Sequence, residues 1–151
     1  MHSSQPRPQQ QIHTVIWVAG DQDISISSHD DAADSWVAVR VGQVLTYAIG
    51  LTAPQSITRI WTAAEQRAAH LLPPTTPVRP QPAGPGIVVR LRGEQTTGGL
   101  RDRNFPYDGR ANSGHILVGG ILWRPVDRAA LTGIADAWRR AAQIADALTG
   151  R

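Results

Sequence analysis

Two stretches of the chain align with each other without a gap: residues 37–72 match residues 114–149. Ten of the 36 aligned positions are identical, and they include Trp61 with Trp138 and Gly42 with Gly119. Further upstream, residues 15–22 match residues 88–95. Such self-similarity favours architectures in which similar units pack against each other. We therefore interpret the chain as two tandem copies of one folding unit.

A proline-rich segment, residues 73–85, separates the two copies. Its proline content excludes a helix or a central strand and favours an extended linker. The copies then span residues 12–72 and 86–151, and they follow a polar tail, residues 1–11, that we expect to be disordered. Each copy has about 60 residues, a size at which an isolated domain is marginally stable. We therefore expect the two copies to share one core.

Four strands are predicted in the first copy, over residues 13–19, 24–27, 36–41 and 44–49, joined as a meander. Gly42-Gln43 has the pattern of a two-residue type II′ hairpin turn, and Gly119-Gly120 occupies the same place in the second copy. In the second copy, residues 96–114 indicate mainly loop where the second strand is expected.

An amphipathic helix is predicted after the strands of each copy. In the first copy the apolar face includes Leu71, and Thr52 with Gln55 predicts a capping box. In the second copy Asp127 is the predicted N-cap. We expect Trp61 and Trp138 to be equivalent core residues. The predicted fold is thus α+β, a tandem duplication of a ββββα unit with two antiparallel sheets and two amphipathic helices in a pseudo-twofold arrangement.

This succession of two ββββα units resembles the Whirly and PUR-repeat families of single-stranded nucleic-acid-binding proteins. The resemblance covers nearly the whole chain at the level of topology. It implies that the sheets bind nucleic-acid strands by stacking and by backbone contacts. The aromatic residues facing out from the sheets would then be Trp17, Trp36, Tyr47 and Trp123. The basic signature motif of the Whirly family is absent, so no family binding residue is carried over.

Several classes of site are excluded by composition and motif. The chain has no cysteine, which excludes disulfides, thiolate metal sites and a cysteine nucleophile. No GxSxG, HExxH, Walker or Rossmann pattern occurs, and neither His13 nor His115 has a serine or carboxylate at motif spacing. No signal peptide or membrane-spanning apolar run is present. We therefore expect a cytoplasmic bacterial protein with no enzymatic activity, no cofactor and no membrane contact.

One acidic cluster, formed by His29, Asp30, Asp31 and Asp34, offers the ligand types that a divalent cation takes. A polar hairpin loop accounts for the same residues, and we predict no metal site.

Charge is divided unevenly between the copies. All 15 basic residues are arginine, and the net charge is +3. The first copy has three arginines against six acidic residues, whereas the second has ten against six. Each guanidinium can bind a phosphate bidentately and can stack on a ring. The basic copy combines such cations with aromatic rings in a predicted loop and on a nearby strand, at Arg90, Arg92, Arg101, Arg103, Phe105, Tyr107 and Arg110.

We therefore predict a non-enzymatic binding module that contacts single-stranded DNA or RNA through these seven residues. Two alternatives stay open for the charge itself. The loop's own aspartates can neutralise it, or the acidic copy can dock on the basic copy, within one chain or in a homo-oligomer. The alternative function is a small protein-interaction adaptor, such as a chaperone, immunity or assembly factor, that holds a protein partner on its sheet or helix faces.

Overall fold

The structure, a computed structural model, describes residues 14–31, 34–77, 86–96 and 107–149. The first half contains β1 (Thr14–Val18), β2 (Ile24–His29), β3 (Trp36–Val41), β4 (Val44–Ile49), α1 (Thr52–Ala68) and the 3-10 helix η1 (Ala69–Leu71). The second half contains β5 (Ile87–Arg92), β6 (Tyr107–Asp108), β7 (Ser113–Gly114), β8 (Ile116–Val118), β9 (Ile121–Pro125) and α2 (Arg128–Thr149). These elements confirm the predicted α+β class.

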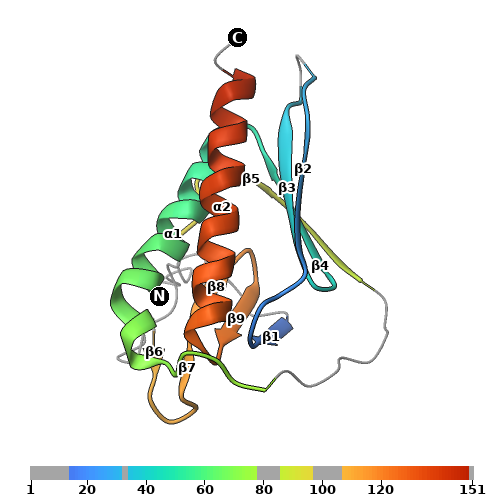
Figure 1. Cartoon of the computed structure of the whole chain (residues 1–151). Coiled ribbons are helices and arrows are strands. Elements are labelled where there is room, and N and C mark those ends of the chain that lie inside the picture. The colour runs from blue at the N-terminus through green and yellow to red at the C-terminus, as the bar shows by residue number, and fades with distance from the viewer. Residues whose placement is uncertain (1–13, 32–33, 78–85, 97–106, 150–151) are drawn as a thin grey trace, which may run out of the picture.

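Within the described residues the strands form a four-stranded sheet in the order β2-β3-β4-β5, a three-stranded sheet in the order β1-β9-β8, and a pair of β6 with β7 (Figure 1). β1 does not join β2. It pairs in parallel with β9, while β5 pairs in parallel with β4. The predictions of a four-strand meander and of two antiparallel sheets are therefore wrong, because both larger sheets are mixed. Alternation along a strand indicates which face is buried, but it does not identify the sheet edge that the strand joins.

The two parallel pairings have corresponding registers. Thr14 lies opposite Ile121 in one sheet, and Ile87 lies opposite Val44 in the other. In the alignment of the two halves, Thr14 corresponds to Ile87 and Val44 corresponds to Ile121. The first strand of each half is thus held, in the same alignment, by the last strand of the other half.

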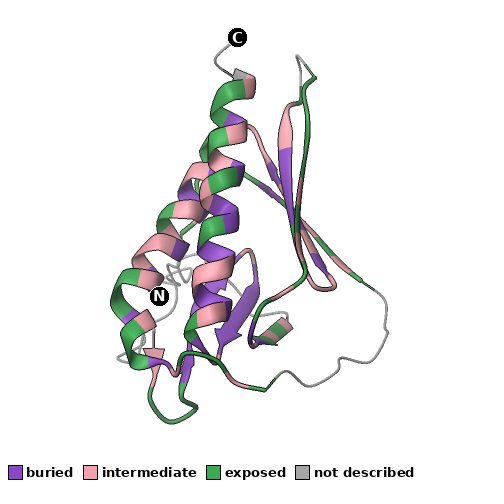
Figure 2. Cartoon of the chain, in the orientation of Figure 1, coloured by how far each residue is buried: buried purple, intermediate pink, exposed green. Residues whose placement is uncertain are grey.

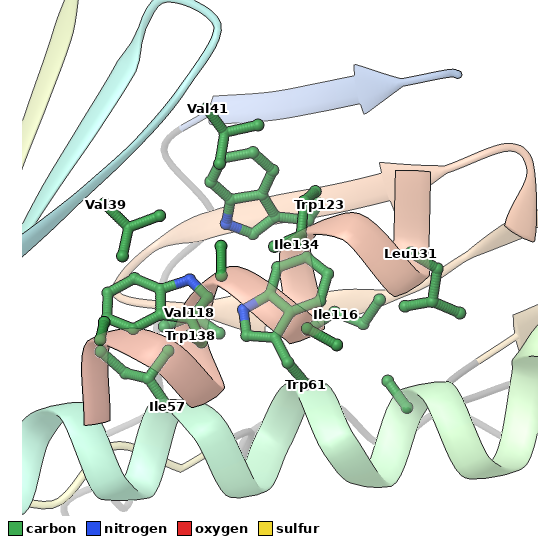
Figure 3. Close-up of a cluster of buried hydrophobic side chains, with 14 of the residues drawn as sticks. Val39, Val41, Ile57, Trp61, Ile116, Val118, Trp123, Leu131, Ile134 and Trp138 are labelled. Carbon is green, nitrogen blue, oxygen red and sulfur yellow. The ribbon is translucent and has the colours of Figure 1, made fainter. Parts of the chain in front are cut away.

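The hydrophobic core lies between the two helices and the inner faces of the two larger sheets (Figures 1 and 2). Trp61 and Trp138 are 1% and 4% exposed, which confirms that both are core residues. Trp123 is not on a sheet surface, contrary to expectation, because it packs edge to face on Trp61 with ring centroids 5.8 Å apart (Figure 3). Leu71, predicted on the buried helix face, is exposed because the helix tightens into η1 and Leu72 takes the buried position.

The two helices begin differently. At α1 the N-cap is Leu51 and no side chain caps the helix, so the predicted capping box of Thr52 and Gln55 is wrong. At α2 the predicted cap is confirmed, because Asp127 Oδ1 accepts a hydrogen bond from the Ala130 amide at 2.8 Å. Its Oδ2 accepts from the Gly20 amide at 2.6 Å and from the amide and hydroxyl of Thr76, both at 2.9 Å. This buried carboxylate therefore joins α2 to the turn after β1 and to the segment after η1.

Between β5 and β8, the described residues form a short hairpin in which Tyr107 lies opposite Gly114. This agrees with the expectation of a mainly loop-like segment at residues 96–114, and a full second strand does not form within residues 107–114.

Candidate nucleic-acid interface

The outer face of the four-stranded sheet lies opposite the face on which the helices pack. α2 packs against β2 and β3, and α1 packs against β4 and β5, all on the inner face (Figure 1). Along β3, Val37 and Val39 are buried under the helices, whereas Trp36 and Arg40 alternate to the outer side. The strand period of two therefore gives the sheet one apolar buried face and one face that carries rings and cations.

Across this outer face, each of the four neighbouring strands contributes one planar side chain. His29 of β2 stacks on Trp36 of β3 with ring centroids 5.7 Å apart. Trp36 meets Tyr47 of β4 edge to face at 4.9 Å. The Arg90 guanidinium of β5 lies over the Tyr47 ring, 5.6 Å from its centroid. We call these four residues the aromatic row.

A surface hollow of about 320 Å³ adjoins the aromatic row and is lined by Asp34, Trp36, Tyr47, Ile49 and Arg90. Its volume is near the lower end of the range of roughly 300–1,000 Å³ that is typical of small-ligand sites. At its rim, Arg92 pairs with Asp34 at 3.0 Å, and both side chains are more than half exposed. Arg90 forms no ion pair with a described residue. The hollow thus combines ring faces with one uncompensated, exposed cation.

The seven residues of the sequence prediction fall into three groups. Arg90 and Arg92 lie on the outer face of β5, which places these second-half cations beside the rings of the first half. Tyr107 and Arg110 lie in and next to the β6–β7 hairpin, on a different sheet. The Tyr107 hydroxyl donates to Asn112 Oδ1 at 2.7 Å, and its ring packs against the core. Arg101, Arg103 and Phe105 lie outside the described residues.

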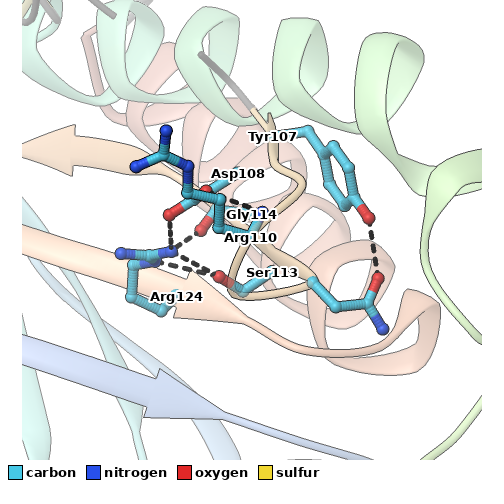
Figure 4. A network of polar contacts seen from close by, with 7 residues as sticks. Tyr107, Asp108, Arg110, Ser113, Gly114 and Arg124 are labelled. Atoms are coloured by element: carbon cyan, nitrogen blue, oxygen red, sulfur yellow. Dashed lines mark hydrogen bonds and ion pairs between the residues drawn. The ribbon is translucent and has the colours of Figure 1, made fainter. Parts of the chain in front are cut away.

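A second polar group, not predicted from the sequence, surrounds Arg124 on β9 (Figure 4). Its guanidinium donates to Asp108 Oδ2 at 2.7 Å, to Ser113 Oγ at 2.7 Å and to the Gly114 carbonyl at 2.9 Å. It also lies over the Trp17 ring, 4.8 Å from the centroid. The hydrogen bond from Arg124 holds the pKa of Asp108 below its ordinary value. No local motif marks Arg124, and the parallel pairing of β1 with β9 is needed to bring Trp17 beside it.

The acidic cluster contributes to the rim of the hollow through Asp34, and His29 Nε2 lies 4.0 Å from Asp31 Oδ2. Among the residues that the structure describes, no group of three or more His, Asp or Glu side chains is arranged to hold a metal ion. In the same residues, neither helix combines the length and apolar character needed to cross a membrane. Comparison with protein-family models, curated proteins and solved structures finds no match to this chain.

Proposed function

We propose that the protein is a non-enzymatic binding module that holds single-stranded DNA or RNA on the outer face of its four-stranded sheet. The observation that carries this proposal is the aromatic row, which places three rings and an exposed arginine on four adjacent strands. Proteins that bind single strands combine ring platforms for the bases with cations for the backbone. The same two components meet here, with the rings supplied by the first half and Arg90 by the second.

The size and chemistry of the face fit a flexible strand better than a duplex. A base stacked on a protein ring contributes about 1–3 kcal/mol, and stacking requires that the base be unpaired from its neighbours. Arg40, Arg90 and Arg92 are exposed on this face and can pair with phosphates. Because the net charge of the chain is +3, we expect modest affinity that falls steeply as salt is added.

The test is fluorescence anisotropy of a labelled single-stranded oligothymidylate, titrated with the full chain over a series of salt concentrations. Trp36→Ala should weaken binding by about 1–3 kcal/mol with little change in the salt slope, because the loss of stacking releases no counterions. The matched control is Trp17→Ala, which removes an exposed Trp from the other large sheet. It should bind like the parent, and the melting temperature of both variants should be recorded.

Failure of the parent chain to bind any single strand at low salt would exclude this function. The protein-interaction adaptor would then better account for the uncovered sheet face. Weakening by Trp17→Ala instead of Trp36→Ala would place the interface on the three-stranded sheet.

We also propose that the two halves are tandem copies of one ββββα unit related by a pseudo-twofold axis. The corresponding registers of β1 with β9 and of β5 with β4 support this origin. The β3–β4 and β8–β9 hairpins do so too, because Val41 lies opposite Val44 and Val118 lies opposite Ile121. A duplicated unit of this kind is the basis of the resemblance to the Whirly and PUR-repeat families.

A further inference from the structure

Each of the two larger sheets carries one arginine over one aromatic ring, at corresponding places. Tyr47 and Arg90 are register partners across β4 and β5, and Arg124 and Trp17 are register partners across β9 and β1. In the alignment of the two halves, Tyr47 corresponds to Arg124 and Arg90 corresponds to Trp17. The cation and the ring have therefore exchanged strands, while the pair itself is present on both sheets.

The two guanidinium groups differ in what binds them. Arg124 is 9% exposed and is bound by the Asp108 carboxylate of the β6–β7 hairpin (Figure 4). Arg90 is exposed and has no carboxylate partner among the described residues. One guanidinium over a ring thus already holds an anion supplied by the chain, and the other is open to solvent.

We infer that Arg90 is the phosphate-binding group of the interface, and that Asp108 occupies the corresponding anion position on the other sheet. This inference rests on the proposed function. A guanidinium stacked on a ring keeps its edge N–H groups directed outward, where two of them can bind phosphate oxygens. Of the two pairs, only the one at Arg90 can receive a ligand while the β6–β7 hairpin stays in place.

A nucleic-acid phosphate fits this position better than the carboxylate of an acidic peptide. Beside Arg90, the hollow offers the faces of Trp36 and Tyr47, and nucleobases have flat π-surfaces that match them. An acidic peptide would instead bring its carboxylates toward Asp34 at the rim without any planar group for the rings. We therefore assign the sugar-phosphate backbone to the β5 side of the sheet and the bases to β3 and β4.

The test compares Arg90→Ala with Arg67→Ala in the oligothymidylate titration. Both variants remove one exposed arginine and change the net charge equally, but Arg67 lies in the last turn of α1. Arg90→Ala should lower the slope of log K against log salt by about 0.7, the value for one phosphate contact with a single strand. Arg67→Ala should leave the slope unchanged. Arg90→Lys should restore the slope, because an ammonium also pairs with phosphate.

Two results would overturn the assignment. The first is an unchanged salt slope in Arg90→Ala while Trp36→Ala still weakens binding, which would leave the proposed function intact and place the phosphate elsewhere. The second is an oligoglutamate peptide that competes for the site as strongly as an unlabelled oligothymidylate of equal charge, since the ligand would then be an acidic peptide. Absence of binding by the parent chain would instead overturn the proposed function and this assignment together.

Discussion

Arg124 is a buried cation whose N–H groups are matched on several sides. Burying an unpaired charge is strongly unfavourable, and removing one partner of a buried ion pair leaves the other uncompensated. Here the Asp108 carboxylate supplies the opposite charge, Ser113 and the Gly114 carbonyl accept further hydrogen bonds, and Trp17 covers one face of the guanidinium. This arrangement fixes the β6–β7 hairpin on β9.

The Asp108–Arg124 pair makes stability depend on pH. Because Arg124 lowers the pKa of Asp108, this carboxylate stabilises the folded state above its unfolded-state pKa of about 3.9. The stabilisation is lost as the pH falls through the lowered pKa of the folded state. Asp108→Asn should therefore be less stable than the parent at neutral pH, and the difference should shrink on acidification. Urea denaturation at a series of pH values measures it, with Asp23→Asn as the control for one lost charge. A difference independent of pH would contradict this account.

At the scale of elements, the sequence is informative where the signal is local. The alternation of β2, β3 and β4 and the three-and-four spacing of α1 and α2 predict these elements, and the Gly42 and Gly119 turns join the predicted hairpins. The exchange of β1 and β5 does not follow from such local signals, because it depends on edges contributed by segments distant in sequence. For the same reason the sequence predicts Arg90 as a site residue without Trp36 and Tyr47 as its neighbours.

The two hairpin turns give a prediction about close packing. Gly42 and Gly119 have positive φ angles of 58° and 59°, so a side chain causes similar backbone strain at either, about 1–2 kcal/mol. A Cβ at Gly119 would lie 2.5 Å from Leu91 Cδ2, whereas at Gly42 the nearest atom is Gln22 Oε1 at 3.9 Å. Gly119→Ala should therefore cost a further 1–3 kcal/mol or so in unfolding free energy compared with Gly42→Ala.

Chemical denaturation of the two variants measures this difference. Adding Leu91→Ala to each variant provides the control, because removal of the Leu91 side chain should abolish most of the extra cost at Gly119 and none of the cost at Gly42. Equal costs for the two single variants would show that Leu91 moves aside freely.

At the scale of the whole molecule, the two halves are joined by more than a linker. Each half supplies an edge strand to the sheet of the other, and α1 lies along α2. The Thr58 hydroxyl of α1 donates to the Trp138 carbonyl of α2 at 2.9 Å. Asp127 of the second half binds Gly20 and Thr76 of the first. The aromatic row itself combines residues of both halves, so the proposed interface exists only when the halves are assembled.

We therefore expect residues 12–75, produced alone, to be poorly folded. In this fragment β1 would lack β9, β4 would have an open edge in place of β5, and Trp61 would lose its contact with Trp123. A chain of this size buries too little surface to offset these losses. Circular dichroism during heating should show no cooperative transition for the fragment, and adding residues 86–151 should restore one because the missing strands and helix return. A monomeric fragment that unfolds cooperatively would contradict the shared core.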